Sequence, residues 1–132
     1  MKKAIIYMAA TLLCLASCKT QGVLSLDNQS FKITELNGRP LNSSEEIKPA
    51  ISFADNRVNA TVGCNRIFAS YTAGTDGSIK FNQGGSTRMM CPEALREDEF
   101  LAAFNNVAHY KYNGKEVRFY NAKKQLLFKA HK

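Results

Sequence analysis

The sequence predicts a mainly β domain, a curved antiparallel sheet or barrel of about eight short strands with one α-helix packed on it. Three observations support this fold class. Most of the chain after residue 29 consists of short runs in which apolar and polar residues alternate, which is the period of a half-buried strand. Turn-forming pairs such as Asn37-Gly38 and Asn113-Gly114 separate these runs. The apolar period changes to three and four residues once, between residues 93 and 108.

The first 17 residues have the features of a secretory signal peptide. Met1-Lys2-Lys3 is basic, and the run from Ala4 to Leu15 that follows is uncharged and almost wholly apolar. This run is too short for a membrane-spanning helix, which needs about 20 apolar residues. It ends at Leu15-Ala16-Ser17-Cys18, which resembles a bacterial lipobox. The resemblance implies cleavage before Cys18 and diacylation of that cysteine. The alternative is an ordinary secreted protein in which Cys18 is incidental.

Acyl chains on Cys18 would anchor the protein to a membrane. Lys19, where inner-membrane retention uses aspartate, resembles the sorting signal of an outer-membrane lipoprotein, so we expect the cell envelope, at the outer membrane. Cleavage removes two of the 18 basic residues and none of the 11 acidic ones, which leaves a net charge of +5. We expect residues 18–28 to form the lipidated N-terminus and a tether, and residues 29–132 to form one domain.

Strands are predicted in order along this domain, and the turn pairs place most of their ends. They are expected around Phe31 and Ile33, over 50–54, 58–63 and 67–72, at Ile79 and Phe81, over 86–90, and around Tyr110–Tyr112, Val117–Phe119 and Leu126–Phe128. Residues 39–49 read as a polar connection, and Asn82-Gln83-Gly84-Gly85 is expected to end its strand. Closing such a chain of strands into a barrel would hide the unpaired edges.

The change of period predicts a helix over residues 93–108. Its apolar stripe consists of Phe100, Leu101, Phe104, Val107 and Ala108. Pro92 suits a first helical turn, and acidic residues gather at this positive end of the helix dipole. Arg96 is expected on the solvent face. The stripe should cover one open side of the barrel.

Two motifs carry a family resemblance. Gly63-Cys64-Asn65-Arg66, with Tyr71 after it, and Ser86-Thr87-Arg88-Met89-Met90-Cys91, before the helix, resemble the META domain, also called the HslJ-like or DUF306 family. The resemblance covers about residues 29–130. It implies a curved antiparallel β-barrel-like fold with one helix, often carried on bacterial envelope lipoproteins, and its HslJ-like branch is associated with stress-inducible envelope proteins. It implies no reaction.

Cys64 and Cys91 stand in the two motifs and would be the cysteines of the mature domain. In an oxidising envelope compartment they could form a disulfide. The alternative is two buried thiols that act as small apolar residues. A redox-active pair has less support, because the chain has no Cys-x-x-Cys spacing. The cysteines and histidines also lack a zinc-ligand spacing, and neither histidine is placed as a catalytic base. We therefore expect no metal, no cofactor and no catalytic residue.

Two groups of surface residues remain as candidate contact sites. Asn65, Arg66, Ser86, Thr87 and Arg88 would form one polar cluster if the two motifs pair, either as an anion or carbohydrate site or as groups that satisfy the backbone at a bend. The C-terminal hairpins are basic through Lys111, Lys115, Arg118, Lys123 and Lys124. Behind a lipobox, such a face would meet anionic lipid or glycolipid head groups rather than nucleic acid, or would simply be solvated.

The sequence therefore favours a lipid-anchored, non-enzymatic envelope protein. Its domain would bind an unknown envelope protein or anionic glycolipid, in support of outer-membrane integrity or stress tolerance. The alternative is a carrier of a hydrophobic or lipid ligand inside the barrel, since a barrel of about eight strands can hold one small ligand. An enzyme has little support.

Overall fold

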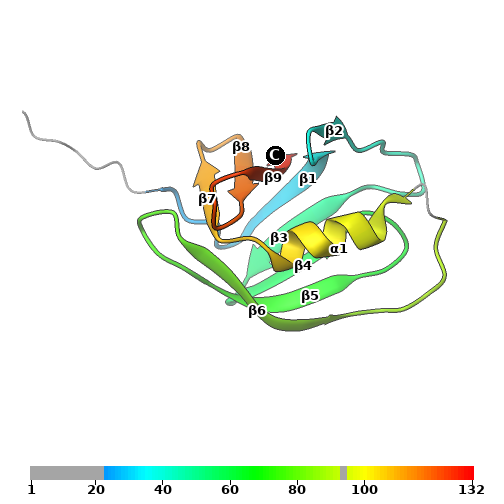
Figure 1. Cartoon of the computed structure of the whole chain (residues 1–132), viewed down its shortest axis with the longest axis horizontal. Coiled ribbons are helices and arrows are strands. Elements are labelled where there is room, and N and C mark those ends of the chain that lie inside the picture. Colours follow the sequence, from blue (N-terminus) through cyan, green and yellow to red (C-terminus); the bar gives the residue numbers. More distant parts are fainter. Residues whose placement is uncertain (1–22, 93–94) are drawn as a thin grey trace, which may run out of the picture.

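The computed structural model describes residues 23–92 and 95–132, so the expected signal peptide and Cys18 lie outside the described residues. The elements follow one another along the chain as Figure 1 shows. They are β1 (Gln29–Leu36), β2 (Arg39–Pro40), β3 (Ala50–Ala54), β4 (Arg57–Thr61), β5 (Ile67–Ala73), β6 (Ile79–Ser86), α1 (Glu97–Asn105), β7 (His109–Tyr112), β8 (Glu116–Tyr120) and β9 (Leu126–His131). No helix among these residues is long and apolar enough to cross a membrane.

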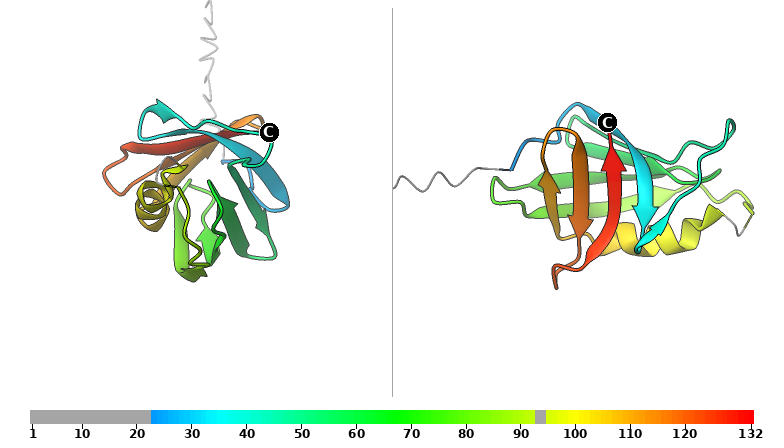
Figure 2. Two further views of the ribbon diagram at one scale, coloured as in Figure 1. Left: turned by 90° about the vertical axis from the view of Figure 1, so that its right-hand side faces the viewer. Right: turned by 90° about the horizontal axis from the view of Figure 1, so that it is seen from above.

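One antiparallel sheet contains all the strands, in the order β6-β5-β4-β3-β1-β9-β8-β7, with the short β2 paired to β1. The two ends of this sheet curl toward each other. Where β6 and β7 begin, Ile79 donates a backbone hydrogen bond to Ala108 at 3.1 Å, and Tyr110 donates one to Gly77 at 2.9 Å. Farther along, helix α1 lies across the opening that the sheet leaves (Figures 1 and 2). The predicted fold, a nearly closed barrel-like sheet with one helix, is confirmed.

The tight turns follow from residues that tolerate a positive φ. Asn37 and Gly38, between β1 and β2, have φ of 50° and 79°. Asp55 and Asn56, between β3 and β4, have φ of 51° and 60°. Such pairs match the right-handed twist of the strands that they join. The predicted turn at Asn37-Gly38 thus ends β1, whereas β2 lies within residues 39–49, which were expected to be a polar connection.

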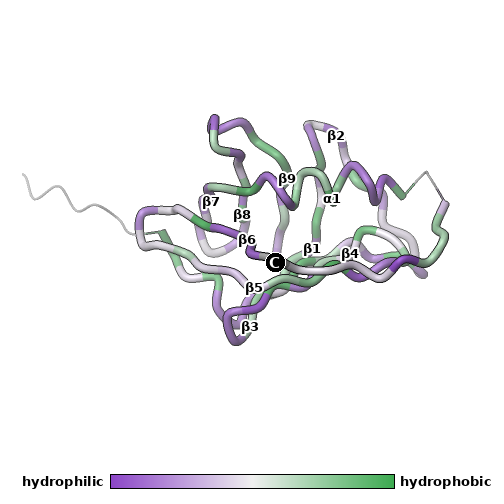
Figure 3. The backbone as a smooth tube through the Cα atoms, turned by 60° about the horizontal axis from the view of Figure 1, so that its bottom comes forward, coloured by the Kyte–Doolittle hydropathy of each residue, from purple (hydrophilic) through white to green (hydrophobic). Residues whose placement is uncertain are grey.

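The aromatic side chains fill the barrel. Phe53 stacks on Phe119 with ring centres 6.0 Å apart, and Phe119 stacks on Phe128 at 4.6 Å. From the helix, Phe100 packs edge-on against Phe128 at 5.0 Å, and both rings are fully buried. Apolar and polar positions alternate along the backbone tube in Figure 3. The large apolar side chains of the core are buried. The apolar stripe predicted for the helix is therefore correct at its centre.

Two strand predictions around residue 84 are wrong. The strand expected to end at Asn82 continues as β6 to Ser86, and the strand expected over 86–90 is absent from residues 87–92. Gly84 explains the first difference, because a Cβ there would lie 1.9 Å from the Phe68 carbonyl oxygen of β5. A glycine at this position lets the strands approach closely rather than breaking the pairing. In the second case, the Met89 backbone bonds to the Asn65 side chain and not to a neighbouring strand.

Helix α1 is shorter than the predicted helix over 93–108. It begins at Glu97, after Arg96 in a left-handed conformation with φ of 56°, and ends at Asn105. Glu93 and Ala94 lie outside the described residues. Pro92 consequently precedes the helix and is not part of its first turn. A left-handed residue without glycine's freedom is uncommon and must be held by its surroundings.

The side chain of Arg96 supplies this support, and its predicted place on the solvent face is wrong. Its guanidinium donates hydrogen bonds to the carbonyl oxygen of Leu36 at 2.9 Å and to the Glu99 carboxylate at 2.7 and 2.8 Å. Asn37 and Arg39 also donate to Glu99, at 3.1 and 2.9 Å. The start of the helix is thus tied to the β1–β2 turn.

The segment from Val23 to Asn28 was expected to be a tether, and the structure differs. Leu26 is buried in the core, with 2% of its surface exposed. The Val23 amide donates to the Thr75 carbonyl oxygen at 3.2 Å, and the Tyr110 hydroxyl donates to that of Leu24 at 3.1 Å. The folded domain therefore starts about six residues before the predicted boundary.

The Glu99 contacts predict an acid-sensitive step in stability. Its hydrogen bonds to Arg96, then to Asn37 and Arg39, lower the pKa of Glu99 to about 2. Because the folded-state pKa is depressed, the stabilisation is present above the ordinary pKa and is lost as pH falls from about 4.5 toward 2. Because 28% of the Glu99 side chain is exposed, solvent screening reduces its contribution to the free energy of unfolding to about 1 to 2 kcal/mol.

Glu99→Gln should therefore lower the free energy of unfolding by about this amount at neutral pH. Over the acidic window it should also lose stability less steeply than the wild type. Denaturant titrations at several pH values measure both effects. Glu46→Gln, at an exposed position between β2 and β3, serves as the control and should behave like the wild type. An unchanged pH dependence in Glu99→Gln would exclude this role.

Candidate functional site

The two sequence motifs meet at one end of the barrel. We call the residues Gly63–Arg66 and Ser86–Cys91 the motif corner. A disulfide joins Cys64 to Cys91, with Cα atoms 5.9 Å apart and a sequence separation of 27. It connects the loop after β4 to the loop that leads into α1. The motif corner is therefore closed both covalently and by hydrogen bonds.

The Asn65 side chain is the centre of this hydrogen bonding. Its amide nitrogen donates to the Met89 carbonyl oxygen and to a Glu97 carboxylate oxygen, both at 2.9 Å. Its amide oxygen accepts from the Met89 backbone at 2.7 Å and from the Thr87 hydroxyl at 3.1 Å. A residue with both a donor and an acceptor is needed for this arrangement. The Thr87 amide still donates to the Arg66 carbonyl oxygen at 3.0 Å, and beyond it the Asn65 side chain supplies the partners of the Met89 backbone.

Glu97 joins the motif corner to the first turn of α1. Its carboxylate also accepts a hydrogen bond from the Asn65 backbone amide at 2.7 Å. Gly63 is needed for this contact, because a Cβ there would lie 2.5 Å from a Glu97 carboxylate oxygen. The sequence assigned Glu97 to the helix dipole, and no motif spacing indicated its contact with Asn65.

The predicted polar cluster is brought together only in part. Asn65 and Thr87 are in contact, and the Thr87 hydroxyl accepts a hydrogen bond from the Arg66 backbone amide at 2.9 Å. The Ser86 hydroxyl donates to the Thr87 carbonyl oxygen at 2.8 Å. The side chains of Arg66 and Arg88 are exposed, and neither forms an ion pair with a described residue. The polar side chains therefore mainly satisfy the backbone at the bend, and the two arginines face solvent.

Met89 separates two hollows at the motif corner. The hollow beside α1 has a volume of about 210 Å³ and includes the apolar residues Val62, Ile67 and Leu101 in its lining. The hollow on the other side has a volume of about 270 Å³ and includes Cys64 and Arg66. The sulfur atoms of Cys64 and Cys91 and a Glu97 oxygen lie within 4.8 Å of one another. Because the two sulfurs are bonded to each other, this group offers no thiolate to a metal.

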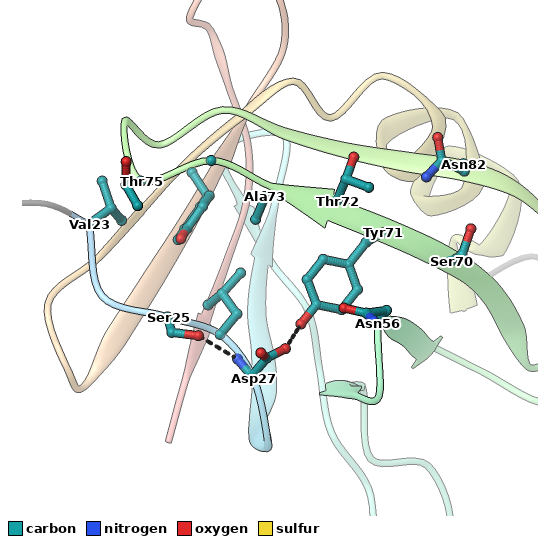
Figure 4. Close-up of a pocket in the computed structure, with 13 residues that line it drawn as sticks. Val23, Ser25, Asp27, Asn56, Ser70, Tyr71, Thr72, Ala73, Thr75 and Asn82 are labelled. Carbon is teal, nitrogen blue, oxygen red and sulfur yellow. Dashed lines mark hydrogen bonds between the residues drawn. The ribbon is translucent and has the colours of Figure 1, made fainter.

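A larger groove, of about 550 Å³, lies where the N-terminal segment crosses β5 (Figure 4). Asp27 accepts a hydrogen bond from the Tyr71 hydroxyl, and its backbone amide donates to Ser25 Oγ at 3.2 Å. Burial, followed by the bond to Asp27, raises the pKa of Tyr71 above its ordinary value. The phenol therefore stays protonated and cannot serve as a base. This contact holds the segment before β1 on the barrel.

With this geometry established, the comparison with known families is informative. The META domain model matches residues 24–132, nearly all of the described chain. The chain belongs to the META domain family. The start of the match agrees with the structure, in which this META domain includes the segment before β1.

Three solved structures share the fold of this META domain. An NMR structure of a protein from Burkholderia xenovorans is 20% identical, with a TM-score of 0.64, and the match covers 81% of this chain and 83% of that chain. A second NMR structure is 23% identical, with a TM-score of 0.63 and coverage of 80% and 91%. The crystal structure of a DUF4847 family protein from Bacteroides vulgatus is 16% identical, with a TM-score of 0.60 and coverage of 80% and 93%. No curated protein matches this chain.

Asn65→Ala should destabilise the META domain by about 2 to 3 kcal/mol, because it removes the side-chain hydrogen bonds to Met89, Thr87 and Glu97 and keeps only the backbone bond to Glu97. Chemical denaturation measures the loss. Asn59→Ala, at an exposed position of β4, is the matched control and should cost less than about 0.5 kcal/mol. Equal effects of the two changes would show that Asn65 does not hold the motif corner.

Proposed function

We propose that this META-domain protein is lipid-anchored in the cell envelope, at the outer membrane, and binds a partner protein there without catalysing a reaction. Its role would be to support outer-membrane integrity or stress tolerance. The lipobox resemblance of Leu15–Cys18 supports the anchor. The family and the solved relatives supply the fold, and none of the three relatives is named as an enzyme.

The observation that carries partner binding is the exposure of two neighbouring methionines at the motif corner. Met89 has 58% of its surface exposed, and Met90 is fully exposed. The disulfide, together with the hydrogen bonds between the Asn65 side chain and the Met89 backbone, holds their backbone in place. Because this backbone is fixed, the two apolar side chains stay in solvent and cannot be buried against their own domain. Methionine side chains are flexible and polarizable, which suits them to contact a partner surface.

The position of the motif corner is consistent with this role. The N-terminal segment (blue) and the loop between β6 and α1 (yellow-green) lie at opposite ends of the long axis in Figure 1 and in the right-hand view of Figure 2. An anchor attached before the N-terminal segment would therefore leave the motif corner at the end farthest from the attachment point. A partner could reach it while the protein stays on the membrane.

The alternative expected from the sequence, a carrier with its ligand inside the barrel, has less support. Phe53, Phe119 and Phe128 are packed against one another in the interior, and each has at most 1% of its surface exposed. A ligand would have to displace these rings. Packing of these large rings in the core explains why the helix has an apolar stripe, and no bound ligand is needed to explain it.

The anchor is tested by growth in radiolabelled palmitate. The wild-type chain should incorporate label and partition into detergent, because acylated Cys18 supplies the hydrophobic group. Cys18→Ala should abolish both properties, whereas Cys64→Ala should retain the label. Labelling of Cys18→Ala would contradict the anchor.

Partner binding is tested by placing a photo-crosslinking residue at Met90 in the lipidated protein in cells. We expect one discrete adduct with an envelope protein, because this side chain points into solvent at the motif corner. The same residue at Lys48, an exposed site between β2 and β3, should not give that adduct. Loss of the adduct on Met89→Ala would support the methionine contact, and an identical adduct from Lys48 would argue against the motif corner as the site.

A further inference from the structure

The positive charge of this protein is concentrated in its last three strands. Residues 109–132 contain seven basic residues and one acidic residue, a net charge of +6. The preceding 108 residues contain eleven basic and ten acidic residues, a net charge of +1. Strands β7, β8 and β9 are neighbours in the sheet, and their outer faces lie side by side in the right-hand view of Figure 2. We call this surface the cationic face; its basic residues are Lys111, Lys115, Arg118, Lys123, Lys124, Lys129 and Lys132.

Three of these charges are aligned in a way that the sheet itself does not favour. Lys111 stands directly opposite Arg118, and Arg118 stands directly opposite Lys129. Like charges opposite one another in an antiparallel sheet are destabilising. The row therefore has no evident benefit for folding. A ligand of opposite charge would relieve the repulsion.

The acidic residues near this row neutralise it only in part. Glu116 pairs with Arg118, and Glu35 pairs with Lys129 at 2.9 Å. Lys111 makes no ion pair with any residue in the described ranges. Its ammonium lies 5.6 Å from the centre of the Tyr120 ring. A shallow hollow of about 280 Å³ beside it is lined by Lys111, Tyr112, Asn113, Glu116, Arg118 and Tyr120.

The N-terminal segment leaves the domain next to this surface. The Tyr110 hydroxyl of β7 bonds to the Leu24 carbonyl oxygen, and the Leu24 side chain lies 3.8 Å from where a Cβ on Gly114 would be, in the β7–β8 turn. The five peptide steps from Cys18 to Val23 span at most about 18 Å. A lipid on Cys18 would therefore hold the edge of the cationic face close to the membrane surface.

We propose that the cationic face docks on the phosphate-bearing head groups of an anionic lipid bilayer. It would lay the META domain against the membrane through β7, β8 and β9. The inference rests on the proposed function for the position of the anchor. Charge complementarity identifies the occupant, since each basic residue near an anionic bilayer strengthens binding by about fivefold. Tyrosines among the cations are also suited to the membrane interface, because each combines an apolar ring with a polar hydroxyl.

The test is cosedimentation with vesicles of phosphatidylcholine alone or of phosphatidylcholine with phosphatidylglycerol. The protein used is the chain from residue 18 onward with Cys18→Ser, so that no acyl chain contributes. It retains the buried core described above, which lies between Leu26 and Ala130. The face variant combines Lys111→Glu, Lys115→Glu and Lys123→Glu. The control combines Lys48→Glu, Arg57→Glu and Lys80→Glu, exposed positions elsewhere on the domain, and has the same net charge.

The wild-type chain should bind the anionic vesicles, and binding should disappear at about 1 M salt, where the Debye length is about 3 Å. The face variant should bind at least about tenfold more weakly than the control. Equal loss in the two variants would show that net charge alone is responsible, and equal binding to neutral vesicles would exclude head-group recognition. If the chain were retained on duplex DNA and did not bind vesicles, the partner of the cationic face would be nucleic acid and not lipid. Each of these results would overturn the proposal. The acyl anchor is judged separately by palmitate labelling, so the two can fail independently.

Discussion

The hydrogen bonds between Asn65 and Glu97 hold helix α1 in the position that the fold requires. The sheet closes only where β6 and β7 begin, and the helix must cover the rest of the opening. Its buried rings, Phe100 and Phe104, can do so only if the first turn lies at a fixed place. Glu97 fixes one side of that turn to the loop after β4, and Glu99 fixes the other side to the β1–β2 turn. The left-handed Arg96 lies between these two attachments.

This arrangement explains why polar residues dominate the motif corner. The loop after β6 leaves the sheet and loses its strand partner, so its backbone groups need other partners. The Asn65 side chain supplies them at Met89, the Thr87 hydroxyl accepts from the Arg66 backbone amide of the facing loop, and the disulfide limits how far the two loops can separate. The side chains of Met89 and Met90 remain exposed because the disulfide and the hydrogen bonds fix the backbone that carries them. The same bonding that stabilises the bend therefore also leaves these two apolar side chains exposed.

The protein also has two distinct surfaces whose chemistry differs. The motif corner offers apolar side chains with two exposed arginines beside them, whereas the outer face of β7, β8 and β9 offers mainly cations. They lie on different parts of the barrel, the corner at the end away from the N-terminal segment and the cationic face beside it. The proposed membrane contact and the proposed partner contact therefore concern separate surfaces of one domain.

The sequence by itself determined the fold class, most strands and the central helix stripe, because these depend on the local period of apolar residues and on turn pairs such as Asn37-Gly38. It also identified Cys64, Asn65 and Thr87 through their motifs. Only the tertiary structure decided that Gly84 continues a strand, that the Arg96 side chain is held at the start of the helix and that Glu97 bonds to Asn65. Each of these depends on an atom from a distant element: the Phe68 carbonyl, the Leu36 carbonyl and the Asn65 amide. Local sequence cannot specify such contacts, because closing the barrel is what brings the partners together.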